Sequence, residues 1–209
     1  LQMVGLNGIR HFNKAAQYLT QEKDCPVDIS QATANVLEVD LHGCSLACHL
    51  PVVIDYALEK MVGKQKLIIK LQHCHNRWLA YSELVKLASK GIACKAQWNN
   101  GTAPKRTLYI LNRGEITPEI FLSNDMANSE MDNDHDMTIE LSLKDFNVTA
   151  LSASYNTHID STVLNNAQDM AWHKGIDVDD AEWEKLKNTA TAILVENSEQ
   201  SQQGAGGLV

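Results

Sequence analysis

The sequence predicts an α+β fold, in which a mixed sheet contains a β-α-β unit and antiparallel hairpins, with N-terminal helices and a C-terminal helix. Three observations support this prediction: apolar residues at helical spacing near the start, a strand–helix–strand pattern in the middle, and an Asn-Gly turn signal directly after it. The 209 residues can bury a sizeable core without disulfides or a structural metal. We expect a single domain over residues 1–197, with a helical subregion over 1–63, and a tail rich in Gly, Ser and Gln over 198–209.

Helices dominate the predicted N-terminal part. Apolar residues recur every three or four positions over residues 9–19, which indicates an amphipathic helix. Asp28 or Ser30 is placed to cap a second, short helix, whose apolar face consists of Ile29, Ala32, Val36 and Leu37. Residues 51–62 are expected to form a third helix, because Pro51 suits a first turn and Gly63 suits a C-terminal stop.

The central residues predict the β-α-β unit. Residues 66–71 form a short apolar strand, Asn76 can cap a helix that ends at Gly91, and residues 92–98 return as a strand. If the two strands share a sheet, they are parallel and their crossover is right-handed. The Asn-Gly pair at residues 100–101 then predicts a hairpin into a strand over 106–111.

The second half of the chain begins with a polar segment over residues 123–136, which we expect to be a surface loop. Residues 137–143 alternate between apolar and polar side chains, as is typical of a strand buried on one face, and residues 148–154 are expected to neighbour it. Residues 179–195 predict the last helix, with acidic side chains in its first turn.

Charge and hydropathy exclude two classes of partner. The 18 Lys and Arg against 26 Asp and Glu give a net charge of −8, which repels nucleic-acid phosphates and anionic lipid. No apolar run approaches the roughly 20 residues of a membrane helix. We therefore expect neither nucleic acid nor a membrane as a partner. The partners that stay open are a second copy of the chain or another protein, and a small anion. The odd number of cysteines and the lack of a signal-peptide pattern favour a cytoplasmic protein.

Short segments of the chain resemble a bacterial protein family of unknown function. The first is Val4-Gly5-Leu6-Asn7-Gly8-Ile9 with Lys14-Ala15-Ala16. The middle one runs from Trp78-Leu79-Ala80 to Ala93-Cys94-Lys95-Ala96-Gln97-Trp98. Those near the end are Trp183-Glu184-Lys185-Leu186, Glu196-Asn197-Ser198-Glu199 and Gly204-Ala205-Gly206-Gly207-Leu208. The family opens with a Leu-Asn-Glu-Ile type segment and closes on a tail rich in Gly and Ala. Gly8 stands where the family has Glu, and residues 25–49 do not match it. The resemblance implies a bacterial cytosolic protein and no particular chemistry.

Thiols and imidazoles gather in two places and are the ligand types that zinc uses. The candidate metal ligands are His42, Cys44, Cys48, His49 and Cys74. On a helix, Cys44 and Cys48 would lie one turn apart on one face, which suits chelation and equally suits two small buried side chains. Because cysteine is among the most buried residue types, we favour packing, expect no cofactor, and keep zinc as the alternative.

The segment over residues 73–77 follows a strand and opens a helix, where sheets with parallel strands bind ligands. In the functional interpretation, Asn76 and Arg77 bind a carboxylate or phosphate, and His73 or His75 acts as general acid or base. The competing interpretation is a helix cap by Asn76, an exposed Arg77 and histidines bonded to loop carbonyls. That interpretation is favoured, because the segment lacks a glycine-rich phosphate loop.

Other motifs add little support for a specific activity. Asp132, Asp134 and Asp136 alternate like calcium ligands, yet the segment lacks the glycine turn and the distal Glu of a calcium loop, so a solvated loop is favoured. Hydrolase, phosphate-loop and dinucleotide fingerprints are all missing from the sequence.

From the sequence, we expect a non-catalytic binding or accessory module. The alternative is a small-molecule enzyme that acts on an anionic substrate near residues 73–77, and a third hypothesis is a transition-metal-binding protein. An anion bound at Asn76 and Arg77 would favour the enzyme, whereas a large apolar self-interface would favour the module.

Overall fold

A computed structural model of the chain describes residues 8–20, 26–125, 134–175 and 177–191. Three predicted features therefore lie partly or wholly outside the described residues. They are the tail over 198–209, part of the polar segment over 123–136, and the end of the last predicted helix.

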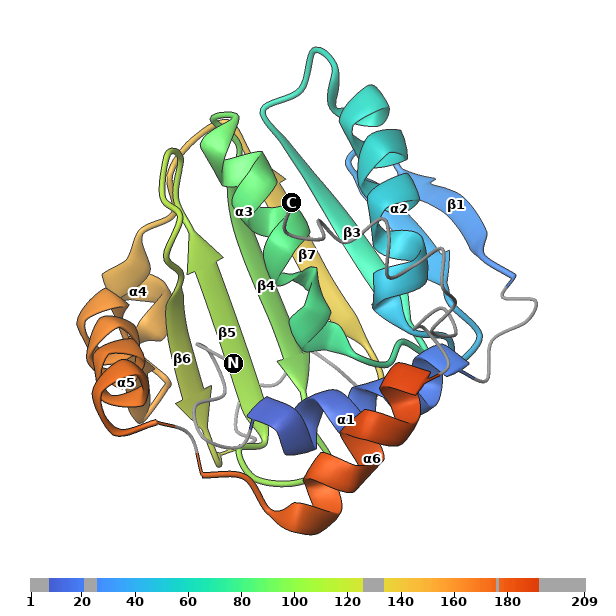
Figure 1. Ribbon diagram of the computed structural model, residues 1–209. Helices are drawn as coiled ribbons and strands as arrows, with labels where there is room; N and C mark the ends of the chain where they lie inside the picture. Colours follow the sequence, from blue (N-terminus) through green and yellow to red (C-terminus); the bar gives the residue numbers. More distant parts are fainter. Residues whose placement is uncertain (1–7, 21–25, 126–133, 176, 192–209) are drawn as a thin grey trace, which may run out of the picture.

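Within the described residues, the fold is built on an eight-stranded mixed sheet (Figure 1). Its strands, in spatial order, are β1 (Asp28–Thr33), β2 (Val36–Asp40), β3 (Lys66–Gln72), β7 (Met137–Ser142), β4 (Ala93–Asn99), β5 (Arg106–Leu111), β6 (Glu119–Ser123) and β8 (Thr157–Ile159). The pair β2–β3 is parallel and the other neighbouring pairs are antiparallel. The prediction of an α+β fold with a mixed sheet is confirmed.

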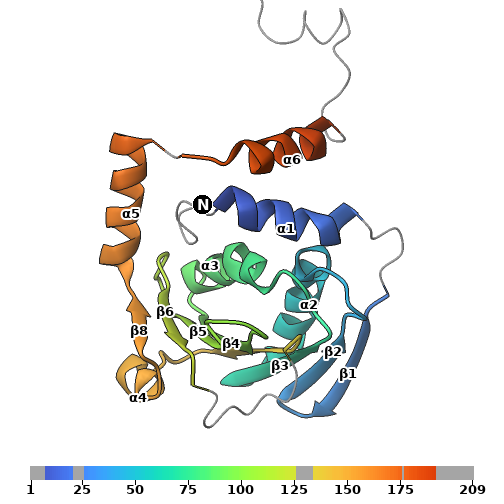
Figure 2. The same ribbon diagram turned by 90° about the horizontal axis from the view of Figure 1, so that it is seen from below.

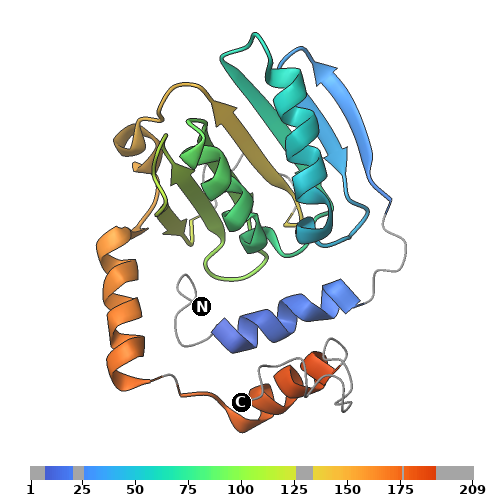
Figure 3. The ribbon, with the colours of Figure 1, turned by 45° about the horizontal axis from the view of Figure 1, so that its top comes forward.

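One face of the sheet carries helices α2 (Leu46–Met61) and α3 (Tyr81–Ser89), the latter preceded by the short 3-10 helix η2 (Arg77–Ala80), as Figure 3 shows. The apolar stripe of each helix is buried, including Leu50, Val53 and Ala57 from α2 and Leu84, Leu87 and Ala88 from α3. These side chains meet buried strand residues such as Leu37, Ile69, Ala96 and Ile139 in the main hydrophobic core.

Helices α1 (Gly8–Thr20) and α6 (Asp180–Thr191) lie side by side beyond α2 and α3 (Figure 2). The Asn13 side chain in α1 donates hydrogen bonds to the backbone carbonyl of Glu182 at 2.7 Å and to its carboxylate at 2.9 Å. The two ends of the described chain are thereby tied together across 169 residues.

Helices α4 (Val148–Ser152) and α5 (Ser161–Lys174) lie at the β6–β8 end of the sheet (Figure 1). On the face opposite α3, a smaller cluster packs Leu108, Ile110 and Phe121 against Phe146, Val148, Leu151 and Tyr155. This cluster covers the outer strands β5 and β6.

Several predicted elements are confirmed. The N-terminal helix, the hairpin between β4 and β5, and the strand over residues 137–142 are all present, and the hairpin pairs Asn99 with Arg106. The helix predicted over 51–62 begins earlier, at Leu46, so that Pro51 lies inside it rather than in its first turn.

The predicted β-α-β unit is present in a different form. β3 and β4 run in the same direction but are not neighbours, because β7 lies between them and is antiparallel to both. Ile139 of β7 lies opposite Ile69 on one side and Ala96 on the other. The adjacent parallel strands are β2 and β3, which α2 connects.

Two predicted elements are wrong. Residues 28–40 form the β1–β2 hairpin and not a helix, because the alternation of Leu37, Val39 and Leu41, all buried, outweighs the helical spacing of Ile29 and its neighbours. Residues 148–152 are helical rather than a strand: the Asn147 side chain accepts a hydrogen bond from the Ala150 N–H at 3.1 Å and caps α4.

Among the described residues, no helix has the length and apolar character needed to cross a membrane.

The position of β7 between β3 and β4 gives a stability prediction. Ile139→Ala removes a fully buried side chain at the centre of the sheet and should lower the free energy of unfolding by about 2–5 kcal/mol. The matched control is Ile116→Ala, the same change at a side chain that is 67% exposed, which should alter it by no more than about 0.5 kcal/mol. Urea unfolding measures both, and equal losses would contradict this packing.

Candidate functional site

The candidate site lies beyond the carboxyl ends of the parallel strands β2 and β3. Asp40 pairs with Gln72 at the last position of the ladder. Beyond it, the two outgoing segments stay joined: the Gly43 N–H donates to the His73 carbonyl at 2.7 Å, and the Leu46 N–H donates to the His75 carbonyl at 2.9 Å. This backbone connection fixes the loops before α2 and before η2 against each other.

Three residues of these loops adopt left-handed backbone conformations. His42, His73 and Asn76 have φ angles of 50°, 49° and 59°. Such angles are uncommon for residues other than glycine, and they gather at sites where the surrounding structure holds them. Here the hydrogen bonds between the two loops do so, and His42 and His73 both face Asp40.

The Asp40 carboxylate lies between two imidazoles. Its Oδ1 is 2.9 Å from His73 Nδ1 and accepts the His42 backbone N–H at 2.8 Å. The His42 ring lies 3.8 Å from Asp40 through Nδ1, and 2.8 Å from Asp28 Oδ2 through Nε2. The His73 side chain is 53% exposed and that of Asp40 27%, so a dissolved molecule can reach the pair.

The pair shifts both pKa values. The hydrogen bond to Asp40 and its negative charge raise the pKa of His73. For Asp40, partial burial alone would raise the pKa, but the hydrogen bonds from His42 and His73 and their charges lower it on balance. The two shifts therefore favour the state in which His73 is protonated and Asp40 is ionised.

A third segment, residues 134–136, closes the site. The Cys74 N–H donates to the His135 carbonyl at 2.7 Å, and the His73 N–H donates to Asp136 Oδ1 at 3.2 Å. The Arg77 guanidinium donates to the Asp134 carbonyl. The end of the acidic stretch predicted to be a solvated loop thus packs against residues 73–77.

Arg77 is half-buried rather than exposed. Its second terminal nitrogen lies 3.4 Å from Asn100 Oδ1, next to the β4–β5 hairpin. Burial lowers the pKa of Arg77, and the negative charges of Asp134 and Asp136 only partly offset this. The guanidinium is nevertheless a permanent cation in proteins and supplies the positive charge that an anion would meet.

Asn76 does not act as the predicted helix cap. Its side-chain amide donates to Ser45 Oγ at 2.9 Å and to the Ala15 carbonyl of α1 at 3.0 Å. The helix that follows it is the four-residue η2, so the open helix N-terminus expected for an anion is replaced by a tight turn. Asn76 thus positions the loop against α1.

His75 packs between aromatic rings. Its imidazole stacks on Tyr18 of α1 with ring centroids 4.1 Å apart, and meets the edge of His135 at 4.9 Å. His73, the other predicted acid–base candidate, has a carboxylate partner at hydrogen-bond distance.

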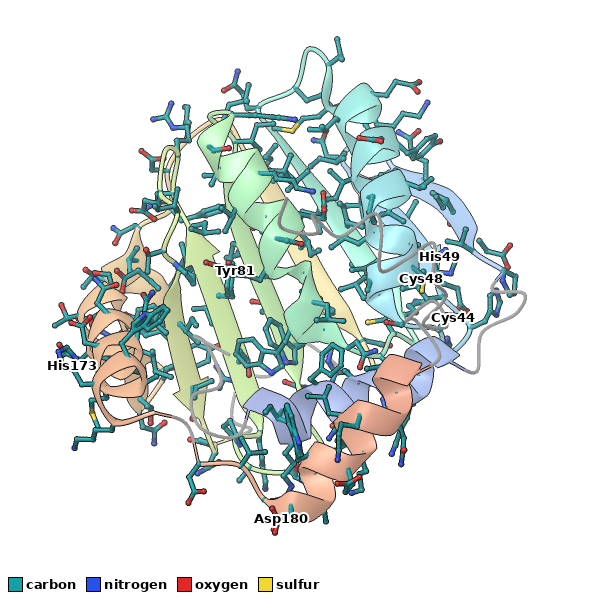
Figure 4. The ribbon with its side chains drawn as sticks, in the orientation of Figure 1. Cys44, Cys48, His49, Tyr81, His173 and Asp180 are labelled. Atoms are coloured by element: carbon teal, nitrogen blue, oxygen red, sulfur yellow. The ribbon has the colours of Figure 1, made fainter. Side chains whose placement is uncertain are left out.

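The predicted metal candidates are not brought together as ligands. α2 begins at Leu46, so Cys44 precedes the helix and does not share a helical face with Cys48 (Figure 4). Cys44 and Cys74 are buried and Cys48 is exposed, so packing describes the first two and not the third. Burial raises the pKa of Cys74 to about 12, which keeps its thiol protonated. No group of three or more such side chains in the described part of the chain is arranged to hold a metal.

The sequence interpretation missed Asp28, Asp40, Tyr18 and His135. The alternation of Leu37, Val39 and Leu41 could have indicated that Asp40 belongs to a strand, shortly before the turn signal at Gly43. Tyr18 and His135 join the site only through tertiary packing.

The chain shares its fold with solved structures of enzymes. A dehydrogenase from Sinorhizobium meliloti aligns at a TM-score of 0.59 with 7% sequence identity, over 85% of each chain. Malate dehydrogenase from Pyrococcus horikoshii aligns at 0.55 with 8% identity, over 92% of this chain and 84% of the other. Sulfolactate dehydrogenase from Methanocaldococcus jannaschii aligns at 0.53 with 8% identity, over 88% and 84%.

Comparison of the sequence with protein-family models and with curated proteins finds no match. The resemblance to a family of unknown function therefore stays a prediction. The expectation of a non-catalytic module, in contrast, is overturned, because the solved structures that share this fold are named as dehydrogenases.

The ion pair gives a pH prediction. The raised pKa of His73 means that its contribution to stability is complete below about pH 6.5 and is lost as the pH rises through the folded-state value. The lowered pKa of Asp40 means that its contribution is complete above about pH 3.8 and is lost on acidification below that.

In Asp40→Asn, which keeps an acceptor for the His42 N–H, the His73 pKa should fall toward 6.5, as measured by NMR titration of the imidazole. Asp145→Asn, at the exposed carboxylate paired with Arg113, is the control and should leave it unchanged. An unchanged His73 titration in Asp40→Asn would show that the two groups are not coupled.

Proposed function

We propose that the protein is an enzyme that acts on a small anionic substrate, with His73 as its general acid and base. The observation that carries this proposal is the Asp40 carboxylate between two imidazoles, at the carboxyl ends of the parallel strands and open to solvent. The common fold with dehydrogenases supports an enzyme over a binding module.

In this proposal, Asp40 orients His73. The hydrogen bond to Nδ1 fixes the ring and leaves Nε2 as the nitrogen that exchanges a proton with a substrate oxygen. His42 donates its backbone N–H to Asp40 and ties its own ring to Asp28, so it holds the carboxylate in place. The raised pKa of His73 favours the acid role near neutral pH and the base role at higher pH.

Arg77 is the proposed anion-binding residue. It lies in the same loop as His73, and both residues are bonded to the segment over 134–136. A guanidinium carries five N–H donors, so Arg77 can bind a carboxylate and keep its bonds to Asp134 and Asn100. Asn76 positions this loop and does not contact the substrate.

The proposed substrates are small 2-hydroxy or 2-oxo acids. The names of the fold neighbours include malate and sulfolactate, which are both small anionic hydroxy acids. Oxidation of such an acid passes the hydroxyl proton to His73, which is the step assigned here, and passes a hydride from the adjacent carbon to a two-electron acceptor of the nicotinamide or flavin class, which would have to be supplied as a co-reactant. The connections β2–α2 and β3–η2 lack a glycine-rich turn, so they do not fit a dinucleotide bound through such a turn, and the proposal concerns proton transfer alone.

His73→Asn should lower turnover by about 10²–10⁴-fold, the usual contribution of a general acid–base group. The assay follows conversion of malate, sulfolactate and their 2-oxo acids, with reduced and oxidised nicotinamide dinucleotides and artificial electron carriers. His158→Asn is the control, because it breaks another exposed imidazole–carboxylate pair, with Glu119, and should leave turnover unchanged. Equal effects of the two changes would contradict the role of His73.

Arg77→Ala should weaken binding of the cognate acid by about 1.5–3 kcal/mol, the contribution of a charge-assisted hydrogen bond. Calorimetric titration measures the affinity. The matched control is Arg113→Ala, which removes an exposed guanidinium paired with Asp145. If the acid binds both variants equally, Arg77 is not the anion-binding residue.

A further inference from the structure

A small pocket lies between η2 and the sheet. Its free space is about 10 Å³, close to what one water molecule or one ligand oxygen requires. Arg77, Trp78 and Tyr81 line it from the helical side, and Trp98 of β4 and Tyr109 of β5 from the sheet. Figure 4 labels Tyr81 at the start of α3.

The two sheet residues of the pocket carry hydrogen-bond donors without partners. Trp98 and Tyr109 are each 2% exposed, and neither the indole N–H nor the phenol O–H has a partner among the described residues. A buried donor without a partner is costly, and buried Trp and Tyr usually find one. Both side chains line the same pocket, because Tyr109 lies opposite Ala96, two residues before Trp98 on the same face of β4.

The chemistry of the lining selects the ligand. The indole can only donate, and the guanidinium of Arg77 can only donate. Burial raises the pKa of Tyr109, so its phenol also stays protonated and available as a donor. Three side chains that carry donors thus line a space for one atom, which favours an acceptor oxygen there, and the positive charge of Arg77 favours a negative one.

The aromatic side chains that line the pocket favour a carboxylate over a phosphate. Trp78 stands edge-on to Trp98 with ring centroids 4.8 Å apart, and Tyr81 stands edge-on to Tyr109 at 6.3 Å. Removing a doubly charged phosphate from water into such aromatic surroundings costs more than removing a singly charged carboxylate. Arg77, Trp78 and Tyr81 are half-buried, whereas Trp98 and Tyr109 are buried, so the pocket deepens from η2 toward the sheet.

We infer that this pocket binds one carboxylate oxygen of the substrate, with Trp98 and Tyr109 as hydrogen-bond donors and Arg77 as the counter-charge. The inference rests on the proposed function, since it places the carboxylate of the proposed substrate in this pocket. Trp98 and Tyr109 thereby become residues that determine specificity for a carboxylate over a phosphate.

The experiment follows the Trp98 indole N–H resonance by NMR, assigned through its loss in Trp98→Phe. Pyruvate, malate and inorganic phosphate are titrated separately into the full chain. We expect the two carboxylates to shift the resonance downfield, with saturation at concentrations of about 1 mM or below, and phosphate to leave it in place.

Tyr109→Phe separates a binding role from a structural one. It removes the unpaired oxygen without changing the ring, so it should raise the thermal midpoint of the free protein and weaken carboxylate binding at least fivefold. Tyr155→Phe, in the cluster on the opposite face of the sheet, is the matched control and should leave binding unchanged. A lower midpoint with unchanged binding in Tyr109→Phe would mean that a bound water satisfies the phenol, and would overturn the inference.

Failure of this inference differs from failure of the proposed function. An indole resonance that no carboxylate shifts, in a protein whose turnover depends on His73, would overturn the pocket assignment alone. A resonance that carboxylates shift, in a protein without turnover of any acid tested, would support the pocket and contradict the proposed activity.

Discussion

The candidate site depends on the backbone connection between the chain segments that leave β2 and β3. The parallel ladder ends at Asp40 and Gln72, but hydrogen bonds from Gly43 and Leu46 continue it into the loops. Because the loops are held together, Asp40 and His73 lie within hydrogen-bond distance although 33 residues separate them. The left-handed conformations of His42 and His73 are tolerated for the same reason.

Two chemically different surroundings lie close to each other along the loop over residues 73–77. His73 lies among carboxylates, those of Asp40 and Asp136, and is exposed to water. Arg77, four residues later, borders an aromatic pocket. A proton-transfer group benefits from solvent access and charged partners, whereas discrimination between anions benefits from desolvation. In the proposed function, the first role falls to His73 at one end of this loop and the second to Arg77 at the other.

The sequence predicts those parts of the molecule that local patterns determine. The Asn-Gly signal predicts the β4–β5 hairpin, and the position of His73 after an apolar strand marks it as a candidate site residue. Local patterns do not predict that β7 enters between β3 and β4, because a strand's partner is chosen by tertiary packing. The same limit applies to the site: Asp40 ends a strand that was predicted as a helix, and nothing in the sequence links it to His73. Trp98 and Tyr109 are typical strand residues, and only the structure shows that their polar atoms lack partners in the described part of the chain.

The central place of β7 has a consequence for how the molecule is made. During synthesis, β3 and β4 emerge well before residues 137–142, so each has an unpaired inner edge rich in apolar residues until late in translation. Until then, β3 with α2 and β4 with α3 would form two separate parts of the sheet, both of which pair with β7 in the final structure. The final sheet then forms when β7 inserts between β3 and β4, rather than by addition of a strand at an outer edge. Because this route depends on contacts between residues distant in sequence, it is slow. A nascent chain of this fold has a particular need of protection from aggregation in the interval before Met137 is available.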